Sequence, residues 1–456
     1  MSFRTLCLVC VVAIAFTPPV AAQSTFPPDS AIQQLLDGRV SDGRAAGIVI
    51  GLIEPDGSTR VFTAGNAGAG RTFDSNSVFE IGSITKVFTA VLLADMVQRG
   101  EVSLDDPVSK YLPDGVTMPA RDGKDITLGQ LSSQTSGLPR MPNNMRPSNA
   151  LNPYADYTVT QLYEYLGSHQ LRRDPGAQFE YSNLGVGLLG HVLALRAGKS
   201  YEDLVRERIL QPLGMENTAI TLTPTLRQRL VAGHNLAGDT VPLWDLPALA
   251  GAGALRSSMT DMLRFAEAAM RSDGPLHESF ALSLEPRISA GSPQAMIGLG
   301  WIRVFAGSDT IAMHNGGTGG FRTFIGLIPS ARRAVVLLTN TGGPGSDDIG
   351  MHLLNPTLPL APAPRQSVDV PVTVLERYVG TYELAPQFSI VVTLVDGALY
   401  GTATGQQTIR LWPASETRFF IREVEAEVSF ELDADGAVTG LVLHQGGRST
   451  PGRKVQ

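Results

Sequence analysis

The segment from Ser83 to Gly100 constrains the fold most, because it is apolar on nearly every side. Its sequence, SITKVFTAVLLADMVQRG, lacks the polar face of a surface helix and ends at a glycine that suits a helix C-terminus. We therefore predict a helix that is buried all round, which only a large domain can enclose. The chain is long enough for such a core, with 456 residues of which 43% are hydrophobic and 17% charged.

Strand patterns lie on both sides of this helix in the sequence. Residues 45–64 predict two strands joined at a Pro-Asp-Gly turn, and four more strand patterns lie between 298 and 340. Between them, about 104–260, loops rich in proline alternate with short helical segments. Strands at both ends with helices between them predict an α/β or α+β layer fold whose sheet joins distant segments.

The two ends of the chain differ from this central part. An apolar run, TLCLVCVVAIAF, precedes Val20-Ala21-Ala22, a pattern typical of a secretory signal peptide over 1–22 that is cleaved after Ala22. Both cysteines lie inside it, so the mature chain is predicted to form no disulfide. At the other end, a proline-rich linker (355–371) precedes a small all-β domain (372–456) with hairpin signals at two Asp-Gly pairs. We expect that domain to be accessory and the catalytic domain to span 23–354.

The composition excludes several classes of function. A net charge of −7 gives no basic footprint, so nucleic acid is not expected as a partner. The twelve apolar residues of the signal are too few to cross a membrane, and no later run is long enough either, which predicts an exported protein, periplasmic or secreted, with no stable membrane anchor. The sequence has no nucleotide-binding motif and no paired histidines, so we predict no cofactor and no metal.

The first chemical motif is Ser83-Ile84-Thr85-Lys86, at the start of the apolar helix. A serine and a lysine three residues apart share one helical face, so their side chains can meet. Ser83 also lies at the positive end of the helix dipole, and burial of Lys86 favours the neutral amine that can accept a proton. The pair is a candidate nucleophile and base; the alternative is a capping serine beside an ordinary lysine.

Two further motifs follow in the sequence. Tyr181-Ser182-Asn183 precedes a helical segment, and nearby cations would lower the pKa of the phenol enough for it to act as a base. His314-Asn315-Gly316-Gly317 ends a strand and leads into Thr-Gly-Gly-Phe, where glycines let a substrate lie close to the strand. His444-Gln445-Gly446 has a similar spacing but lacks the glycine-rich continuation, so it is not included in the predicted site.

In this order the three motifs resemble those of the serine β-lactamase and penicillin-binding protein superfamily, specifically its class C-like branch. The resemblance covers roughly residues 30–345 and includes LDDPVSKYLPD, ITLGQLSSQTSGLP and PLGMENT. It implies a transpeptidase-like α/β fold, with an antiparallel sheet flanked by helices and an all-helical lobe. The C-terminal domain resembles the lipocalin-like β-barrels appended to some of these hydrolases.

The resemblance also implies roles for the motif residues. Ser83 is the expected nucleophile, Lys86 and Tyr181 share its proton, and the amides of Ser83 and Gly317 form the oxyanion hole. Asn183, His314, Asn315 and Gly316 are expected to bind substrate, with His314 on the substrate carboxylate and titrating near neutral pH.

Two departures bear on the substrate. His314 and Asn315 stand where class C β-lactamases have Lys and Thr, and Arg140-Met141 occupy the stretch that holds a β-lactam-binding Gln. The expected activity is therefore that of a penicillin-binding carboxypeptidase or endopeptidase acting on D-alanyl peptides. The alternatives are a class C-like β-lactamase, an esterase of the same fold, and a penicillin-binding sensor that acylates without turnover.

Overall fold

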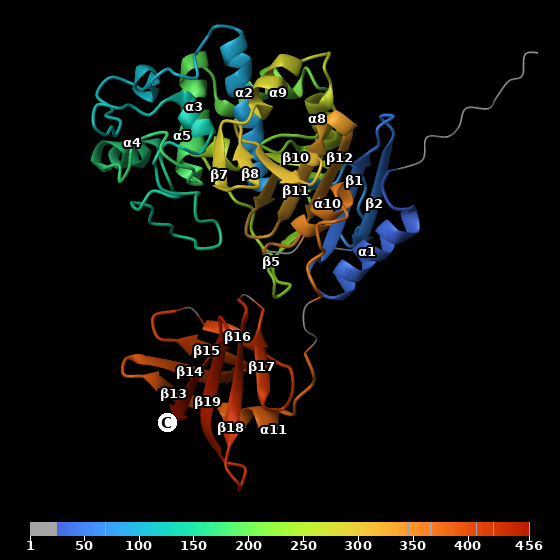
Figure 1. Cartoon of the computed structure of the whole chain (residues 1–456), viewed down its shortest axis with the longest axis vertical. Coiled ribbons are helices and arrows are strands. Elements are labelled where there is room, and N and C mark those ends of the chain that lie inside the picture. Colours follow the sequence, from blue (N-terminus) through green and yellow to red (C-terminus); the bar gives the residue numbers. More distant parts are fainter. Residues whose placement is uncertain are drawn as a thin grey trace, which may run out of the picture. The chain divides into compact units, whose positions relative to one another are not determined.

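The computed structural model describes residues 25–68, 70–343, 346–363, 367–406, 408–422 and 424–455. The predicted signal peptide lies outside these residues. The chain divides into two compact units between Leu360 and Ala361, inside the segment predicted to be a linker. The first unit carries the sheet and all three motifs, and the second is a β-barrel (Figure 1).

The first unit is built on an eight-stranded antiparallel sheet that unites the two strand regions of the sequence. The two N-terminal strands lie beside strands formed nearly 300 residues later, as the colours of Figure 1 show. In spatial order the strands are β2 (Thr59–Gly65), β1 (Gly47–Ile53), β12 (Arg333–Thr339), β11 (Arg322–Ile328), β10 (Asp309–Gly317), β9 (Ile302–Ala306), β8 (Ala295–Ile297) and β7 (Ile288–Ser292).

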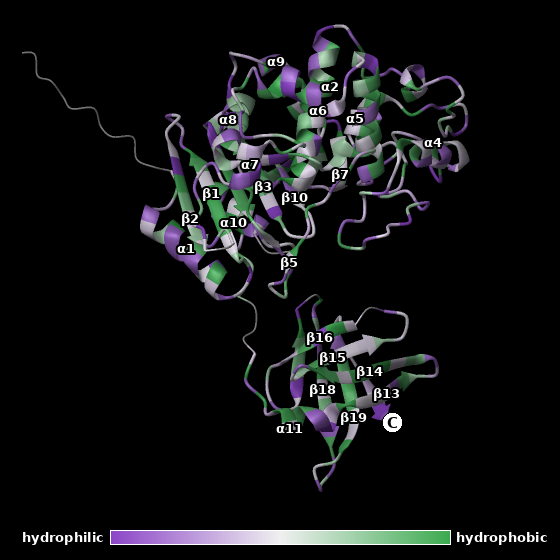
Figure 2. Ribbon diagram, turned by 180° about the vertical axis from the view of Figure 1, so that it is seen from behind, coloured by the Kyte–Doolittle hydropathy of each residue, from purple (hydrophilic) through white to green (hydrophobic). Residues whose placement is uncertain are grey.

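Helices cover both faces of this sheet. One face packs against α1 (Asp29–Ser41) and α10 (Asp347–Leu354), and the other against α8 (Met259–Met270). Strand β1 is buried on both sides, which explains its uninterrupted apolar sequence GIVIGLI and its hydrophobic colour in Figure 2. The remaining helices form the helical lobe and its connections: α2 (Thr85–Gln98), α3 (Leu128–Ser132), α4 (Val159–Ser168), α5 (Asn183–Ala197), α6 (Tyr201–Val205), α7 (Pro224–Arg229) and α9 (His277–Leu284).

The predicted buried helix is confirmed as α2. Twelve of its fourteen residues are buried, from Thr85 to Met96. A short 3-10 turn, η1 (Gly82–Ile84), precedes it, so Ser83 lies just before the helix rather than in its first turn. Two small sheets complete the unit, β3 (Val78–Glu80) with β6 (Arg256–Ser258) and β4 (Gly233–His234) with β5 (Thr240–Val241).

The second unit is a closed barrel whose neighbouring strands are consecutive in the sequence, except that the last strand pairs with the first to close it. Its interior is filled by side chains, with the ring of Tyr378 stacked 4.1 Å from that of Phe430. His444 lies on this barrel and bonds to Ser429 and Ser449, a structural role that agrees with its exclusion from the predicted site. The strands are β13 (Gly380–Ala385), β14 (Phe388–Val395), β15 (Ala398–Ala403), β16 (Thr408–Pro413), β17 (Arg418–Ile421), β18 (Ala426–Leu432), β19 (Val438–Gln445) and β20 (Arg448–Lys454), preceded by α11 (Val372–Leu375).

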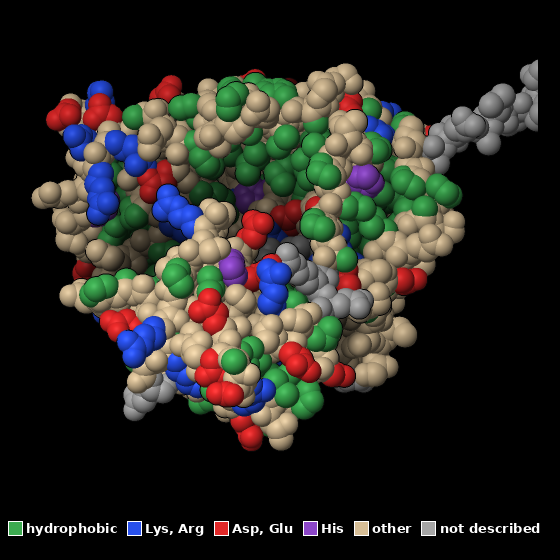
Figure 3. All heavy atoms as spheres, turned by 60° about the horizontal axis from the view of Figure 1, so that its bottom comes forward, with side chains coloured by type: hydrophobic (Ala, Val, Ile, Leu, Met, Phe, Trp, Pro, Cys, Tyr) green, Lys and Arg blue, Asp and Glu red, His purple; other side chains and the backbone are tan. Residues whose placement is uncertain are grey.

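Acidic and basic side chains are interspersed over the face shown in Figure 3. None of the helices in the described ranges is long and apolar enough to span a lipid bilayer.

Each unit has its own hydrophobic core, so we expect the first to fold without the second. Leu358 and Leu360 pack on the core of the first unit, which makes Leu360 the appropriate end of a truncated chain. We expect truncation after Leu360 to leave one cooperative thermal transition, measured by circular dichroism. A truncated chain with no cooperative transition would show that the barrel is needed for the first unit to fold.

Candidate active site

Ser83 is placed at the surface of an otherwise buried stretch. All residues from Ser77 to Met96 are buried except Ser83, which is partly exposed. The preceding Gly82 has a φ of +49°, and a Cβ there would lie 2.7 Å from the backbone nitrogen of Gly317. Only glycine allows this conformation together with so close an approach. The turn that carries Ser83 therefore lies directly against the end of β10.

Lys86 lies beneath Ser83 and has no exposed surface. Its Nζ lies 3.0 Å from Ser83 Oγ and donates a hydrogen bond to the backbone oxygen of Ala252 at 2.6 Å. Burial, and to a lesser extent the positive charge of Arg140, hold the pKa of Lys86 well below that of a free lysine. A neutral amine that donates to Ala252 keeps its lone pair available for the Ser83 proton.

Tyr181 lies next to Lys86. The centre of its ring is 5.0 Å from Lys86 Nζ and also 5.0 Å from the guanidinium carbon of Arg140. Burial raises the pKa of Tyr181, while a hydrogen bond with Ser83 and the charges of Arg140 and Arg322 oppose that rise. The expectation that cations lower this pKa toward a general base is therefore wrong for the unliganded site, because desolvation outweighs them. Tyr181 is a neutral phenol, able to donate a proton.

Asn183 begins α5 next to this group, where its backbone nitrogen donates to the oxygen of Arg140 at 3.0 Å. Its side-chain Nδ2 contacts Met141 Sδ at 3.6 Å and interacts with the hydroxyl of Tyr154. The Oδ1 atom is buried without a hydrogen-bond partner in the described part of the chain. This unpaired acceptor is a place for a substrate N–H.

The third motif lies on β10, and its residues alternate between the two faces of the sheet. Gly316 faces the nucleophile turn so closely that a Cβ would lie 2.0 Å from the oxygen of Ile81. Asn315 has its side chain bonded to Asp347 of α10, with Nδ2 donating to Oδ2 at 2.6 Å. Gly317 lies against Gly82, as described above. The structure thus brings Ser83, Lys86, Tyr181 and the two glycines together.

His314 does not carry the titrating cation that the sequence suggested. Its side chain is 2% exposed, and its Nδ1 lies 2.5 Å from the backbone oxygen of Asn315. Burial lowers the pKa of His314 to about 3, and any positive charge on Lys86 acts in the same direction. The expectation that His314 titrates near neutral pH is wrong, because a charged imidazole would be buried beside the amine of Lys86.

Sequence reasoning missed the residues that form the surroundings of the site. Arg140 was considered only as a replacement for glutamine, although its guanidinium lies over Tyr181. Trp244 lies against the glycine-rich turn, since a Cβ on Gly319 would be 3.0 Å from its Nε1. The ring of Tyr154 lies 5.1 Å from that of Trp244. No local pattern marks these residues, because each belongs to a loop whose partners are distant in the sequence.

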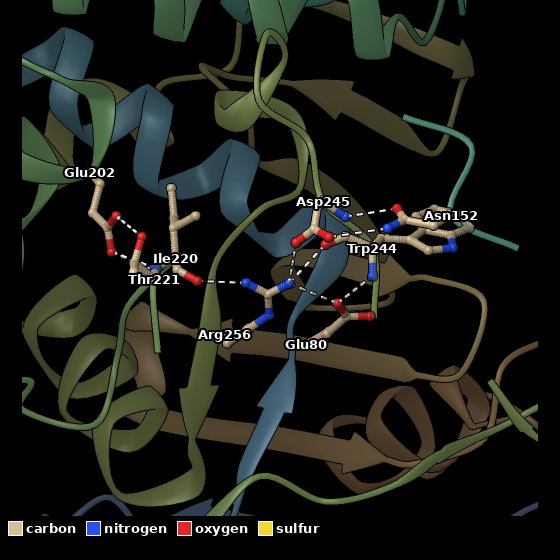
Figure 4. Close-up of polar contacts among 8 residues, drawn as sticks. All are labelled: Glu80, Asn152, Glu202, Ile220, Thr221, Trp244, Asp245 and Arg256. Atoms are coloured by element: carbon tan, nitrogen blue, oxygen red, sulfur yellow. Dashed lines mark hydrogen bonds and ion pairs between the residues drawn. The ribbon is translucent and has the colours of Figure 1, made fainter. Parts of the chain in front are cut away.

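A buried ion-pair network fixes Trp244, as Figure 4 shows. Glu80 Oε1 accepts a hydrogen bond from the backbone nitrogen of Trp244 at 2.8 Å. Arg256 Nη2 donates a hydrogen bond to the backbone oxygen of Trp244, also at 2.8 Å. Asp245 in turn bonds to Asn152 in both directions, at 2.9 and 3.0 Å. Glu80 lies three residues before Ser83, so the same strand end positions the nucleophile and this wall of the site.

The described residues contain no group of three or more metal-binding side chains. A serine–lysine–tyrosine cluster beside a glycine-rich strand instead supports nucleophilic acyl transfer, in which a lysine replaces the usual histidine as base.

Comparison with known proteins agrees with this chemistry. The β-lactamase family model matches residues 30–355, and a domain of unknown function, DUF3471, matches 364–454. The chain is 32% identical over 340 residues to the D-alanyl-D-alanine-carboxypeptidase/endopeptidase AmpH of Escherichia coli, covering 70% of this chain and 86% of that protein. It is 26% identical to penicillin-binding protein 4* of Bacillus subtilis, covering 82% and 87%.

A solved structure, the β-lactamase/D-alanine carboxypeptidase of Yersinia pestis with citrate, matches with a TM-score of 0.60 and 26% identity, covering 69% of this chain and 94% of that chain. Fold and sequence together define a serine hydrolase of the transpeptidase-like class. The chain belongs to the β-lactamase family, and the barrel is appended to the family's domain.

The low pKa of His314 predicts a specific dependence of stability on pH. Because its pKa is about 3 in the folded chain against 6.5 for a free side chain, the unfolded chain takes up the proton first as the pH falls. We expect this residue to lower the free energy of unfolding between about pH 6.5 and 3 and to contribute no pH dependence above that range. Urea unfolding at several pH values, compared between wild type and His314→Gln, measures this loss.

The partly exposed His277, replaced in the same way, is the matched control. If His314→Gln and wild type lost stability in parallel as the pH fell, burial would not hold this imidazole neutral.

Proposed function

We propose that this protein is an exported serine hydrolase that cleaves D-alanyl peptide amides through an acyl-enzyme and is acylated by related β-lactams. One observation carries the proposal: a lysine whose pKa is held well below its usual value by burial lies 3.0 Å from the one partly exposed hydroxyl in a buried stretch. That arrangement gives a nucleophile with a base in direct contact. The names of the relatives supply the substrate class, and the apolar run before Ala22 supports export.

The first half of the reaction forms the acyl-enzyme. Ser83 Oγ attacks the carbonyl carbon while Lys86 Nζ accepts its proton. The negative charge that develops on the carbonyl oxygen is bound by the backbone N–H groups of Ser83 and Gly317. Tyr181 donates its phenolic proton to the leaving nitrogen as the C–N bond breaks, and it recovers a proton from Lys86.

The second half reverses these roles. Water attacks the acyl carbon while Lys86 accepts a proton from the water. Lys86 then returns this proton to Ser83 Oγ as the bond between the acyl carbon and Oγ breaks. The unpaired Oδ1 of Asn183 binds an N–H of the acyl group and holds the ester in place. The neutral His314 contributes packing next to Tyr181, with ring centres 6.2 Å apart, rather than charge.

A β-lactamase is the second candidate, favoured by the family match and by relatives that carry that name. The burial of His314 opposes it, since the residue cannot supply the charge of the lysine that class C enzymes have there. Purified protein assayed with a D-Ala-D-Ala peptide, a chromogenic cephalosporin and a short-chain aryl ester separates the alternatives. Steady peptide turnover supports the proposal, preferential cephalosporin or ester turnover supports the other enzymes, and a single stoichiometric burst supports a sensor.

Ser83→Ala should abolish covalent labelling by penicillin and by a fluorophosphonate, together with all turnover, because the attacking oxygen is removed. Mass spectrometry of the labelled protein measures this directly. A variant that still labels at the wild-type rate would place the nucleophile elsewhere in the chain.

Lys86→Ala and Tyr181→Phe should each reduce the acylation rate by about 10²–10⁴-fold, the usual loss when a proton-transfer group is removed. Stopped-flow acylation by a chromogenic cephalosporin measures the rate for folded variants. Lys110→Ala, which removes an exposed lysine paired with Asp106, is the matched control and should acylate normally. Unchanged acylation in Tyr181→Phe would remove the phenol from the proton path.

A further inference from the structure

An ion pair beside the end of β10, between Arg322 of β11 and Asp347 of α10, is not used in the mechanism above. Asp347, in the first turn of α10, accepts hydrogen bonds from Arg322 Nε at 2.9 Å, from Arg322 Nη2, and from Asn315 Nδ2 at 2.6 Å. Three N–H donors from two neighbouring strands therefore converge on one carboxylate. Arg322 and Asp347 are 26% and 23% exposed, so the pair is partly open to solvent.

This ion pair lies next to the position proposed for the oxyanion. Arg322 is the cross-strand partner of Gly317, and a Cβ on Gly317 would lie 3.4 Å from Arg322 Nη1. A substrate carbonyl bound to the Gly317 amide has its neighbouring residue within about 3.6 Å along the chain. A carboxylate directly next to the scissile bond on this side would therefore reach the Arg322 guanidinium.

The donor set has the chemistry of a carboxylate site. A guanidinium binds a carboxylate through two parallel N–H groups, and here Arg322 uses two of its nitrogens on Asp347 in that way. The side-chain amide of Asn315 supplies a third donor to the same group. The chain's own carboxylate already occupies these donors, and the neutral His314 adds no positive charge beside them.

We propose that Asp347 is a built-in substitute for a substrate carboxylate and selects against substrates with a free carboxylate next to the scissile bond. Within each substrate class, the site then favours internal peptide bonds and amidated C-termini over a free C-terminus, and uncharged esters over those with a carboxylate. The physical basis is the repulsion between two carboxylates that compete for one guanidinium. The inference rests on the proposed acyl transfer at Ser83 and narrows its substrate class.

The test compares substrates that differ only in this charge. One pair is a peptide ending in D-Ala-D-Ala and its C-terminal amide, and a second pair is an aryl ester with and without a carboxylate on the leaving phenol. For wild type, we expect kcat/KM to be about tenfold or more higher for the neutral member of each pair. A preference for the charged member would overturn the inference.

Two variants should shift this ratio in opposite directions. Asp347→Asn frees the guanidinium, so kcat/KM for the charged substrates should rise about tenfold or more while the neutral ones change little. Arg322→Gln leaves the acidic group uncompensated, so the charged substrates should lose activity further. The double variant should lose the gain of Asp347→Asn, because that gain needs Arg322. Because the two variants should change kcat/KM for the charged substrates in opposite directions, either one tests the inference if the other fails to fold.

Asp309→Asn is the matched control. Asp309 is the first residue of β10, at the opposite end of the strand from Gly317, and it pairs with Arg333 at 3.9 Å. It should leave all ratios unchanged. If Asp347→Asn also left them unchanged, the inference would be wrong.

If wild type turns over none of the peptides or esters, the proposed function fails instead. The rates of Ser83 labelling by penicillin, which carries a carboxylate, and by a neutral fluorophosphonate then still report the same ratio in each variant. An increase in penicillin labelling relative to fluorophosphonate labelling in Asp347→Asn supports the inference, and an unchanged ratio contradicts it.

Discussion

The close approach of the nucleophile turn to β10 is the constraint on which the rest of the site depends. Gly82 and Gly316 both lie where a Cβ would collide with backbone of the opposite segment, at 2.7 Å from Gly317 and 2.0 Å from Ile81. Thr323 strengthens the contact by donating from Oγ1 to the oxygen of Ile81 at 2.9 Å. Since the turn and the strand are more than 230 residues apart in the sequence, this contact is what turns a serine near a helix start into a nucleophile beside an oxyanion-binding strand.

Burial determines the charge states in this region. The ring centre of Tyr181 lies 5.0 Å from Lys86 Nζ and 6.2 Å from the ring centre of His314, and desolvation is the largest influence on the pKa of each of these residues. Desolvation favours the uncharged form of each, because a charge on one would be buried without water beside the others. Neutrality makes Lys86 a base and Tyr181 an acid, the complementary pair that acyl transfer to and from Ser83 requires.

The sequence predicted the elements that depend on local pattern. The buried helix was evident from its uninterrupted apolar residues, six of the eight strands of the sheet from their apolar and β-branched runs, and the Ser-Lys contact from helical spacing. The short strands β7 and β8 were not predicted. The charge state of His314 was not predictable, because its burial arises from packing between β10 and distant segments. The pairing of Arg322 with Asp347 was equally hidden, since nothing in either local sequence indicates its partner.

The loops around the site show how chemistry and selectivity are separated in this fold. Trp244 is held by bonds to side chains outside the catalytic cluster, so its replacement alters a wall of the site without altering the proton transfers. Arg140 and Arg322 differ from it, because the charge of each opposes the rise in the pKa of Tyr181, and the charge of Arg140 also lowers the pKa of Lys86. An anionic substrate group that neutralised Arg140 would raise the pKa of Lys86 and weaken its tendency to release a proton. The charge of Arg140 therefore affects both which substrates bind and how strongly Lys86 binds a proton. This double role restricts the residues that can replace Arg140.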